Sequence, residues 1–222
     1  MIDPASRIRM CLSVFIVVVR YWWPEKRAIQ IAPSRLYIWP NIFIEFMLKI
    51  RLRKYESGDR DACIGVFNSN VPHFLAHQEL AEFLDYLDSG PPSYWVLVES
   101  GQVIGCGGFG QETDDSIVSL HWGLIGSAWH GKRIGELLLL ARVIEAIKTH
   151  TPDKIRIATS QHTQSFFGKY GFAAEQTTKD GFADGIDLIE MYLTLTSASI
   201  SAIDSAWERA SNLLEHERPE DA

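Results

Sequence analysis

The chain has 222 residues, of which 46% are hydrophobic and 22% are charged, and its formal net charge is −7 at pH 7. This composition is that of an ordinary globular protein, and it excludes an intrinsically disordered or collagen-like chain. The negative charge argues against a general nucleic-acid binder, which needs a basic face, although an acidic surface attracts cations such as amines.

The first 46 residues do not share the pattern of the rest of the chain. Residues 11–19 form an apolar run that is much shorter than the roughly 20 residues of a membrane-spanning helix, so we expect no membrane association. No small-residue cleavage site of a signal peptide follows this run. We interpret residues 1–46 as an upstream extension outside the fold, or as the product of a wrongly assigned start codon, and we predict that a domain begins at Met47.

From Met47 onwards the apolar pattern predicts alternating strands and helices. Strands are predicted where apolar residues alternate with polar ones or form short buried runs, and helices where they recur every three or four residues. In chain order these are a strand at 48–53, helices at 61–67 and 75–87, strands at 94–99, 102–109 and 117–125, a helix at 135–148, a strand at 154–159, a helix at 163–170 and a strand at 187–195. One more strand near 174–178 is left open. The order β-α-α-β-β-β-α-β-α-β is that of a mixed α/β layer fold.

Two segments of this pattern carry further expectations. Gly105, Gly107 and Gly108 weaken the strand at 102–109 and predict a bulge or close backbone packing there. Residues 196–222 predict an amphipathic helix followed by a charged tail, and the helix would either form a homodimer or cover the domain.

The cysteines and histidines predict neither disulfide bonds nor a metal site. Cys11, Cys63 and Cys106 are odd in number and have no paired spacing, which favours a reducing, cytoplasmic location. Cys106 is interpreted as a core residue. His73 and His77 would share one face of a helix, but no third ligand accompanies them, so no metal is expected.

The strongest functional signal is the segment LIGSAWHGKRIGELL at 124–138, in which a strand enters a short loop that opens a helix. Backbone N–H groups at the start of a helix are unpaired and favour a pyrophosphate. The small loop residues would admit phosphate oxygens to the main chain, and Lys132 and Arg133 add positive charge. A plain basic turn before a helix is the alternative interpretation.

This segment resembles motif A of the Gcn5-related N-acetyltransferase (GNAT) family, which reads Gln/Arg-x-x-Gly-x-Gly/Ala. His130 stands at the Gln/Arg position, Arg133 at the first Gly position and Gly135 at the last. Arg133 is the serious departure, because its side chain would crowd a loop that Gly opens, unless it contacts a phosphate directly. The segment SFFGKYGF at 165–172 resembles motif B of the same family, and the element order over 47–195 is similar to that of a poorly characterised bacterial-type branch.

The resemblance implies a mostly antiparallel central sheet with flanking helices, and an enzyme that transfers an acetyl group from acetyl-CoA to an amine by direct attack in a ternary complex. The acceptor would be a small-molecule amine or a protein amino group. Residues implied to bind the cofactor are Leu124, Ile125, Gly126, His130, Gly131, Lys132, Arg133, Ile134, Gly135 and Glu136. Two alternatives stay open, a non-catalytic acyl-CoA-binding sensor and an unrelated α/β binding module.

The acid and base of this reaction are predicted less directly. His121 lies on the strand that enters the loop and has a pKa suited to proton transfer, but it could equally be a packing residue. Phe167 stands where the family often places a tyrosine acid, and it has no proton to donate. Tyr170, one helical turn later, is the candidate acid, with packing as the alternative. Gln161 and His162 would contact substrate or cap the next helix.

Overall fold

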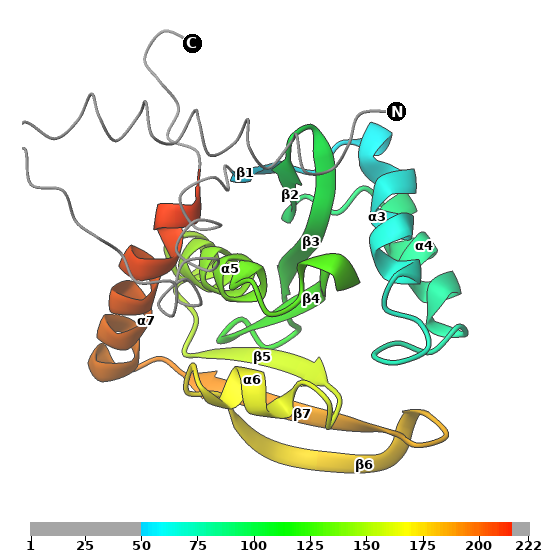
Figure 1. The fold of residues 1–222 in the computed structure, drawn as a ribbon. Helices are drawn as coiled ribbons and strands as arrows, with labels where there is room; N and C mark the ends of the chain where they lie inside the picture. Colours follow the sequence, from blue (N-terminus) through cyan, green and yellow to red (C-terminus); the bar gives the residue numbers. More distant parts are fainter. Residues whose placement is uncertain (1–49, 215–222) are drawn as a thin grey trace, which may run out of the picture. The chain divides into compact units, whose positions relative to one another are not determined.

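A seven-stranded sheet with helices on both faces makes up the part of the chain that the computed structural model describes, residues 50–214 (Figure 1). The predicted extension at 1–46, the beginning of the first predicted strand and the charged end of the tail lie outside these residues.

The elements agree with the predicted order, with one strand more. They are β1 (Ile50–Lys54), η2 (Ser57–Asp59), α3 (Arg60–Asn68), α4 (Glu79–Asp88), β2 (Tyr94–Glu99), β3 (Gln102–Gln111), β4 (Ile117–Ile125), η3 (Ser127–Trp129), α5 (Ile134–His150), β5 (Lys154–Thr159), α6 (Gln164–Gly168), β6 (Ala173–Ala183), β7 (Ile186–Thr194), α7 (Ser197–Ala210) and η4 (Ser211–Leu213). The α/β fold with a mostly antiparallel sheet is therefore confirmed.

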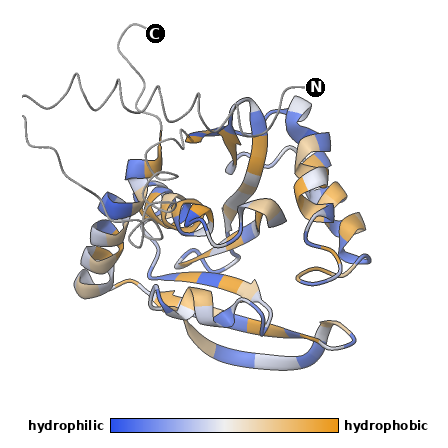
Figure 2. Ribbon diagram, viewed as in Figure 1, coloured by the Kyte–Doolittle hydropathy of each residue, from blue (hydrophilic) through white to orange (hydrophobic). Residues whose placement is uncertain are grey.

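Three elements differ from their predicted lengths for physical reasons. Helix α4 begins at Glu79 rather than at 75, and the Glu79 carboxylate accepts a hydrogen bond of 2.6 Å from the Ala76 N–H, which holds the turn before the helix. Helix α6 ends at Gly168, a poor helix former. Strand β6 is much longer than the segment near 174–178, and most of its residues are exposed, so it carries little apolar signal (Figure 2).

The strand order is β1-β2-β3-β4-β5-β7-β6, and only β4 and β5 pair in parallel. That parallel pairing runs only from Ile117 opposite Lys154 to Leu120 opposite Ile157. Beyond it, β4 continues beside β3 and β5 continues beside β7. The two central strands therefore part, and residues 121–125 have no strand partner on the side of β5.

Two apolar layers hold the helices against the sheet. Helix α5 packs on one face through a set of fully buried side chains that includes Leu137, Leu139 and Val143. Helices α3 and α4 cover the other face through a separate cluster around Phe67 and Phe83. Helix α7 buries Ile203, Ala206 and Ala210 in the α5 layer, so it covers the domain; dimerisation stays a prediction. No helix within residues 50–214 is both long and apolar enough to cross a membrane.

The irregularity predicted for the strand at 102–109 is confirmed by two bulges, one in β3 itself and one opposite it in β4. Against β2, Gly105 pairs with Leu97 and Val103 with Val98, so Ile104 is an extra residue in β3. Gly108 pairs with His121, but Cys106 pairs with Leu124, so β4 has one residue more than β3 over this stretch. Trp122, inside the bulge, has a φ of 42°. The glycines of β3 permit the close packing around it, because a Cβ at Gly107 would lie 3.0 Å from the Cα of Gly123.

Candidate functional site

The parted edge of β4 is built from backbone carbonyls that side chains hold in place. The Tyr94 hydroxyl donates to the carbonyl of Trp122 at 3.0 Å, and the Asn70 amide donates to the carbonyl of Ile125 at 2.9 Å. His130 Nε2 also lies 2.9 Å from the Ile125 oxygen. Because the carbonyl oxygens of Trp122 and Ile125 already accept hydrogen bonds from side chains, this segment of β4 is fixed in position. It favours a ligand that brings its own acceptors for the backbone N–H groups of the segment.

The loop that follows this edge is shaped for an anion. Gly131 has a φ of 73° and Arg133 a φ of 65°, and α5 begins directly afterwards at Ile134. The first N–H groups of a helix lack intrahelical acceptors and carry partial positive charge. Lys132 is exposed, with its Nζ 4.5 Å from the centre of the Trp129 ring. The loop and helix start together can hold a phosphate or pyrophosphate.

Gly135 completes the loop in a way that fits the motif. A Cβ at this position would make ordinary contacts, 3.7 Å from the Phe166 ring and 3.8 Å from the Ile125 side chain. Alanine therefore fits as well as glycine, which is the choice that the motif allows.

Arg133 adopts the left-handed conformation that favours glycine, which explains physically why the motif has Gly at this position. Its Nε donates to the Glu136 carboxylate at 2.9 Å, and its Nη2 lies 3.5 Å from the carbonyl of Arg209 on α7. These contacts direct the side chain along α5 towards α7.

His121 is half-buried on the α3 and α4 side of the sheet, immediately before the bulge. Its ring lies edge-on to Tyr86 with 5.6 Å between centroids, and its Cε1 would lie only 2.9 Å from a Cβ at Gly110. Burial lowers the pKa of this imidazole, and the charge of Glu112 partly opposes that shift. The ring is therefore held neutral, the form that accepts a proton.

Tyr170 lies in different surroundings, next to the start of α5. Its ring packs against Phe166 at 5.4 Å between centroids. Burial, followed by the charge of Glu136, raises the pKa of Tyr170 to about 12, so the hydroxyl stays protonated at neutral pH. The structure does not place His121 and Tyr170 in one cluster, because one packs on α4 and the other on α5, and their roles as base and acid stay predictions.

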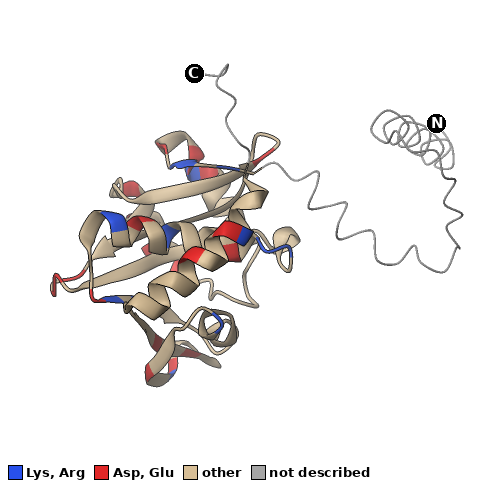
Figure 3. Ribbon diagram, turned by 90° about the vertical axis from the view of Figure 1, so that its left-hand side faces the viewer, with Lys and Arg blue, Asp and Glu red and all other residues tan. Residues whose placement is uncertain are grey.

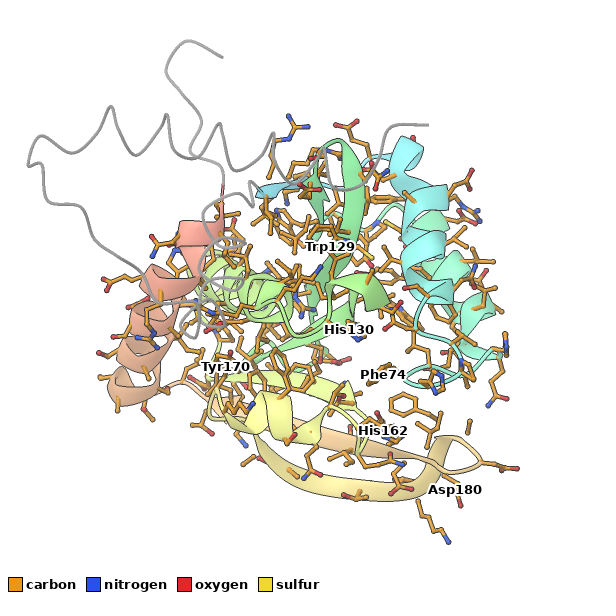
Figure 4. The ribbon with its side chains drawn as sticks, viewed as in Figure 1. Phe74, Trp129, His130, His162, Tyr170 and Asp180 are labelled. Atoms are coloured by element: carbon orange, nitrogen blue, oxygen red, sulfur yellow. The ribbon has the colours of Figure 1, made fainter. Side chains whose placement is uncertain are left out.

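Several residues that contribute to the site carried no sequence signal. Phe74, in the loop between α3 and α4, is 38% exposed, and its ring lies 5.1 Å from that of His130 and 6.4 Å from that of His162 (Figure 4). Asn70 and Tyr94 act through single hydrogen bonds to distant strands, which no local pattern indicates.

The far rim of the site is tied together by glutamines. The Gln78 amide donates to the carbonyl of Phe182 at 2.9 Å and so links the α3–α4 loop to the β6–β7 hairpin. Gln161 donates to the Gly185 carbonyl at 2.7 Å and accepts from the Asp187 N–H at 3.0 Å. The structure thus gives Gln161 a role in holding the hairpin turn.

The remaining polar groups indicate no second centre. Cys106 is fully buried, as predicted for a core residue. The pKa of the Cys63 thiol is raised, first by its hydrogen bond with Cys106 and then by burial. Among residues 50–214, no group of three or more His, Cys, Asp or Glu is arranged to hold a metal ion. Positive and negative residues are interspersed over the elements seen in Figure 3.

Comparisons with known proteins agree with this geometry. The family model described as an acetyltransferase (GNAT) domain matches residues 61–195. Ard1 from Thermoplasma volcanium is 14% identical over 67% of this chain and 99% of its own, with a TM-score of 0.57. The ribosomal-protein-alanine N-acetyltransferase from Brucella melitensis is 20% identical over 65% of this chain and 99% of its own, with a TM-score of 0.53.

A third solved structure, Rv2747 from Mycobacterium tuberculosis in complex with CoA, is 17% identical over 65% of this chain and 99% of its own, with a TM-score of 0.51. No curated protein matches the chain. At these identities the solved structures show the fold alone, whereas the family match covers more than half of the chain. This chain therefore belongs to the GNAT family of acetyltransferases.

Proposed function

We propose that the chain is an N-acetyltransferase that transfers the acetyl group of acetyl-CoA to an amine. The observation that carries the proposal is the parting of β4 from β5 directly before the start of α5. An unpaired strand edge suits the amide groups of the pantetheine arm, and the helix start suits the pyrophosphate. Membership of the GNAT family supports the same co-substrate.

The residues at this opening fit such a co-substrate. The backbone of Leu124, Ile125 and Gly126 would lie along the pantetheine, and the loop from His130 to Glu136 would hold the pyrophosphate. Backbone N–H groups around Leu124 and Ile125 would also polarise the thioester carbonyl, as in an oxyanion hole, whereas the Gly126 N–H already donates to the carbonyl of Ile104 at 2.9 Å.

The reaction requires a neutral amine and a proton for the departing thiolate. The amine nitrogen forms a bond to the thioester carbon, the C–S bond breaks, the amine gives up one proton and the CoA sulfur takes one. His121, which burial keeps neutral, is the proposed base. Tyr170 or water is the proposed source of the thiolate's proton.

The proposal is tested by calorimetric titration of the full chain with acetyl-CoA, followed by a thiol-release assay with a panel of amines and peptides. We expect a Kd in the micromolar range and CoA release with at least one amine. Binding without release for every amine would favour the non-catalytic alternative. The absence of binding would reject the acetyltransferase assignment.

Replacing Arg133 by glycine should leave co-substrate binding intact and stabilise the fold. Relief of the left-handed backbone should add about 1 kcal/mol to the free energy of unfolding, and the lost contacts of this partly exposed side chain should subtract less than that. The Kd for acetyl-CoA should change less than about threefold if backbone N–H groups hold the pyrophosphate. Arg133→Ala, which keeps the strained backbone, is the matched control. A tenfold weaker Kd in both variants would instead assign the guanidinium to the phosphate.

Phe74 is proposed to contact the acceptor amine, because it is an exposed aromatic side chain at the mouth of the opening. Phe74→Ala should raise the KM for the best amine about fivefold while the Kd for acetyl-CoA stays constant. Steady-state kinetics and calorimetry measure the two quantities separately. An unchanged KM would place the acceptor elsewhere.

A further inference from the structure

Arg142 is a cation enclosed between α5 and the sheet. The residue is 4% exposed, and its Nε donates to the carbonyl of Leu138 at 3.2 Å. None of the ion pairs within residues 50–214 includes it, so no carboxylate of this part of the chain neutralises its charge. A buried charge without a counter-charge is costly, which indicates a role other than packing.

The guanidinium points into the β4 bulge through space that two glycines leave free. A Cβ at Gly123 would lie 2.5 Å from Nη2, and a Cβ at Gly107 would lie 3.1 Å from Nη1. Burial lowers the pKa of Arg142 to about 10, so the side chain is still positively charged at neutral pH.

The bulge carbonyls are held from both faces of the sheet. From the α5 side, Arg142 Nη1 lies 3.4 Å from the carbonyl of His121 and 3.5 Å from that of Gly108. From the α3 side, the Tyr94 hydroxyl donates to the carbonyl of Trp122. These contacts from Arg142 and Tyr94 fix two consecutive peptide groups of the bulge, those that follow His121 and Trp122.

A donor on a peptide carbonyl also acts on the N–H of the same peptide group. The carbonyl of His121 shares its peptide with the N–H of Trp122, and the carbonyl of Trp122 shares its peptide with the N–H of Gly123. Hydrogen bonds in a chain polarise one another, and a charged donor does so more strongly in a low-dielectric interior. A cation on the His121 carbonyl therefore makes the following N–H a stronger donor.

We propose that Arg142 is a positioning residue for acyl transfer, which holds the β4 bulge and, through the carbonyl of His121, strengthens the N–H of Trp122 as a donor to the thioester carbonyl. The inference rests on the proposed function for its consequence in catalysis. Its structural part, the polarised bulge, concerns the protein alone.

The first measurement is made on the ¹⁵N-labelled protein without co-substrate. Arg142→Met should move the amide proton resonance of Trp122 upfield, because the cation on the preceding carbonyl, that of His121, is gone. Val143→Ala, which opens a cavity on the same buried stretch of α5 without touching the bulge, is the matched control and should leave this resonance in place. An unmoved Trp122 resonance in Arg142→Met would overturn the proposal whether or not the protein is an acetyltransferase.

The second measurement is the infrared carbonyl band of bound [1-¹³C]acetyl-CoA, together with steady-state kinetics. In the natural protein the band should lie below that of free acetyl-CoA, and in Arg142→Met it should return towards the free value. We expect kcat to fall about 100-fold, with little change in KM, because one charge-assisted contribution to the oxyanion site is lost.

Two further results decide the interpretation. Arg142→Lys keeps the charge and should recover part of both the band shift and kcat. If Arg142→Met does not fold, the same measurements are made on Arg142→Lys instead. Turnover in the natural protein with an unchanged band in a folded Arg142→Met would reject the role of Arg142. A natural protein that neither binds nor turns over acetyl-CoA would reject the proposed function, while the Trp122 amide resonance still tests the polarised bulge.

Discussion

Gly108→Ala should lower the free energy of unfolding by about 3 kcal/mol, the largest loss expected from adding one methyl group to this protein. A Cβ at Gly108 would lie 2.2 Å from the carbonyl oxygen of Ser93 and 2.6 Å from the Tyr94 ring. The first of these atoms is backbone, so the segment before β2 must move. Because Tyr94 also donates to the carbonyl of Trp122, the movement should reach the β4 bulge and lower turnover too.

The matched control is Gly65→Ala on α3. No atom lies within 4 Å of a Cβ at Gly65, and the position is inside a helix, so the same chemical change should stabilise the protein by about 0.5–1 kcal/mol. Urea unfolding of both variants measures the two free energies. A loss below about 1 kcal/mol for Gly108→Ala would show that the Ser93 segment moves freely and that the close approach is not a constraint.

The fold was predictable because its signals are local. The apolar face of α5 and the short apolar runs of β4 and β5 repeat at the period of their own element, so the sequence places them to within one or two residues. The strand near 174–178 was left open, and β6 extends well beyond that segment, because most of its residues are exposed and an exposed strand has no apolar alternation to detect. The glycines of β3 indicated an irregularity, but only the register shows that there are two bulges, one in β3 against β2 and one in β4 against β3.

The site was less predictable because it depends on contacts between distant segments. The loop at 130–136 could be found from its residues, since a helix start beside small and basic residues is a local feature. Asn70 reaches the Ile125 carbonyl 55 positions away, and Arg142 reaches the His121 carbonyl 21 positions away. His130 was assigned to the phosphate loop by its place in the motif, but its ring points back to the Ile125 carbonyl and to Phe74.

His121→Gln should lower kcat/KM about 100-fold and remove the acidic limb of its pH profile, if His121 is the base. In the natural protein kcat/KM should stay constant as pH falls to about 6.5, the ordinary pKa of histidine, and should decline only below it. The reason is that burial lowers the pKa of His121, so the imidazole stays neutral at a pH where an exposed histidine is already protonated. The profile is measured with acetyl-CoA saturating and the amine below its KM.

The lowered pKa of His121 also makes the stability of the folded protein depend on pH. The folded protein binds the His121 proton less tightly than the unfolded chain does, so protonation favours unfolding. The contribution of His121 to the free energy of unfolding is therefore complete above about pH 6.5 and is lost as pH falls through the lowered pKa. His121→Gln should remove this part of the acid destabilisation, whereas His150→Gln, at the far end of α5, should leave the rate profile unchanged. An acidic limb of kcat/KM that persists in His121→Gln would assign the base to another group. The stability profile is measured separately, by urea titrations at each pH. If His121 has a packing role alone, His121→Gln should therefore change the stability profile and leave the acidic limb of kcat/KM in place.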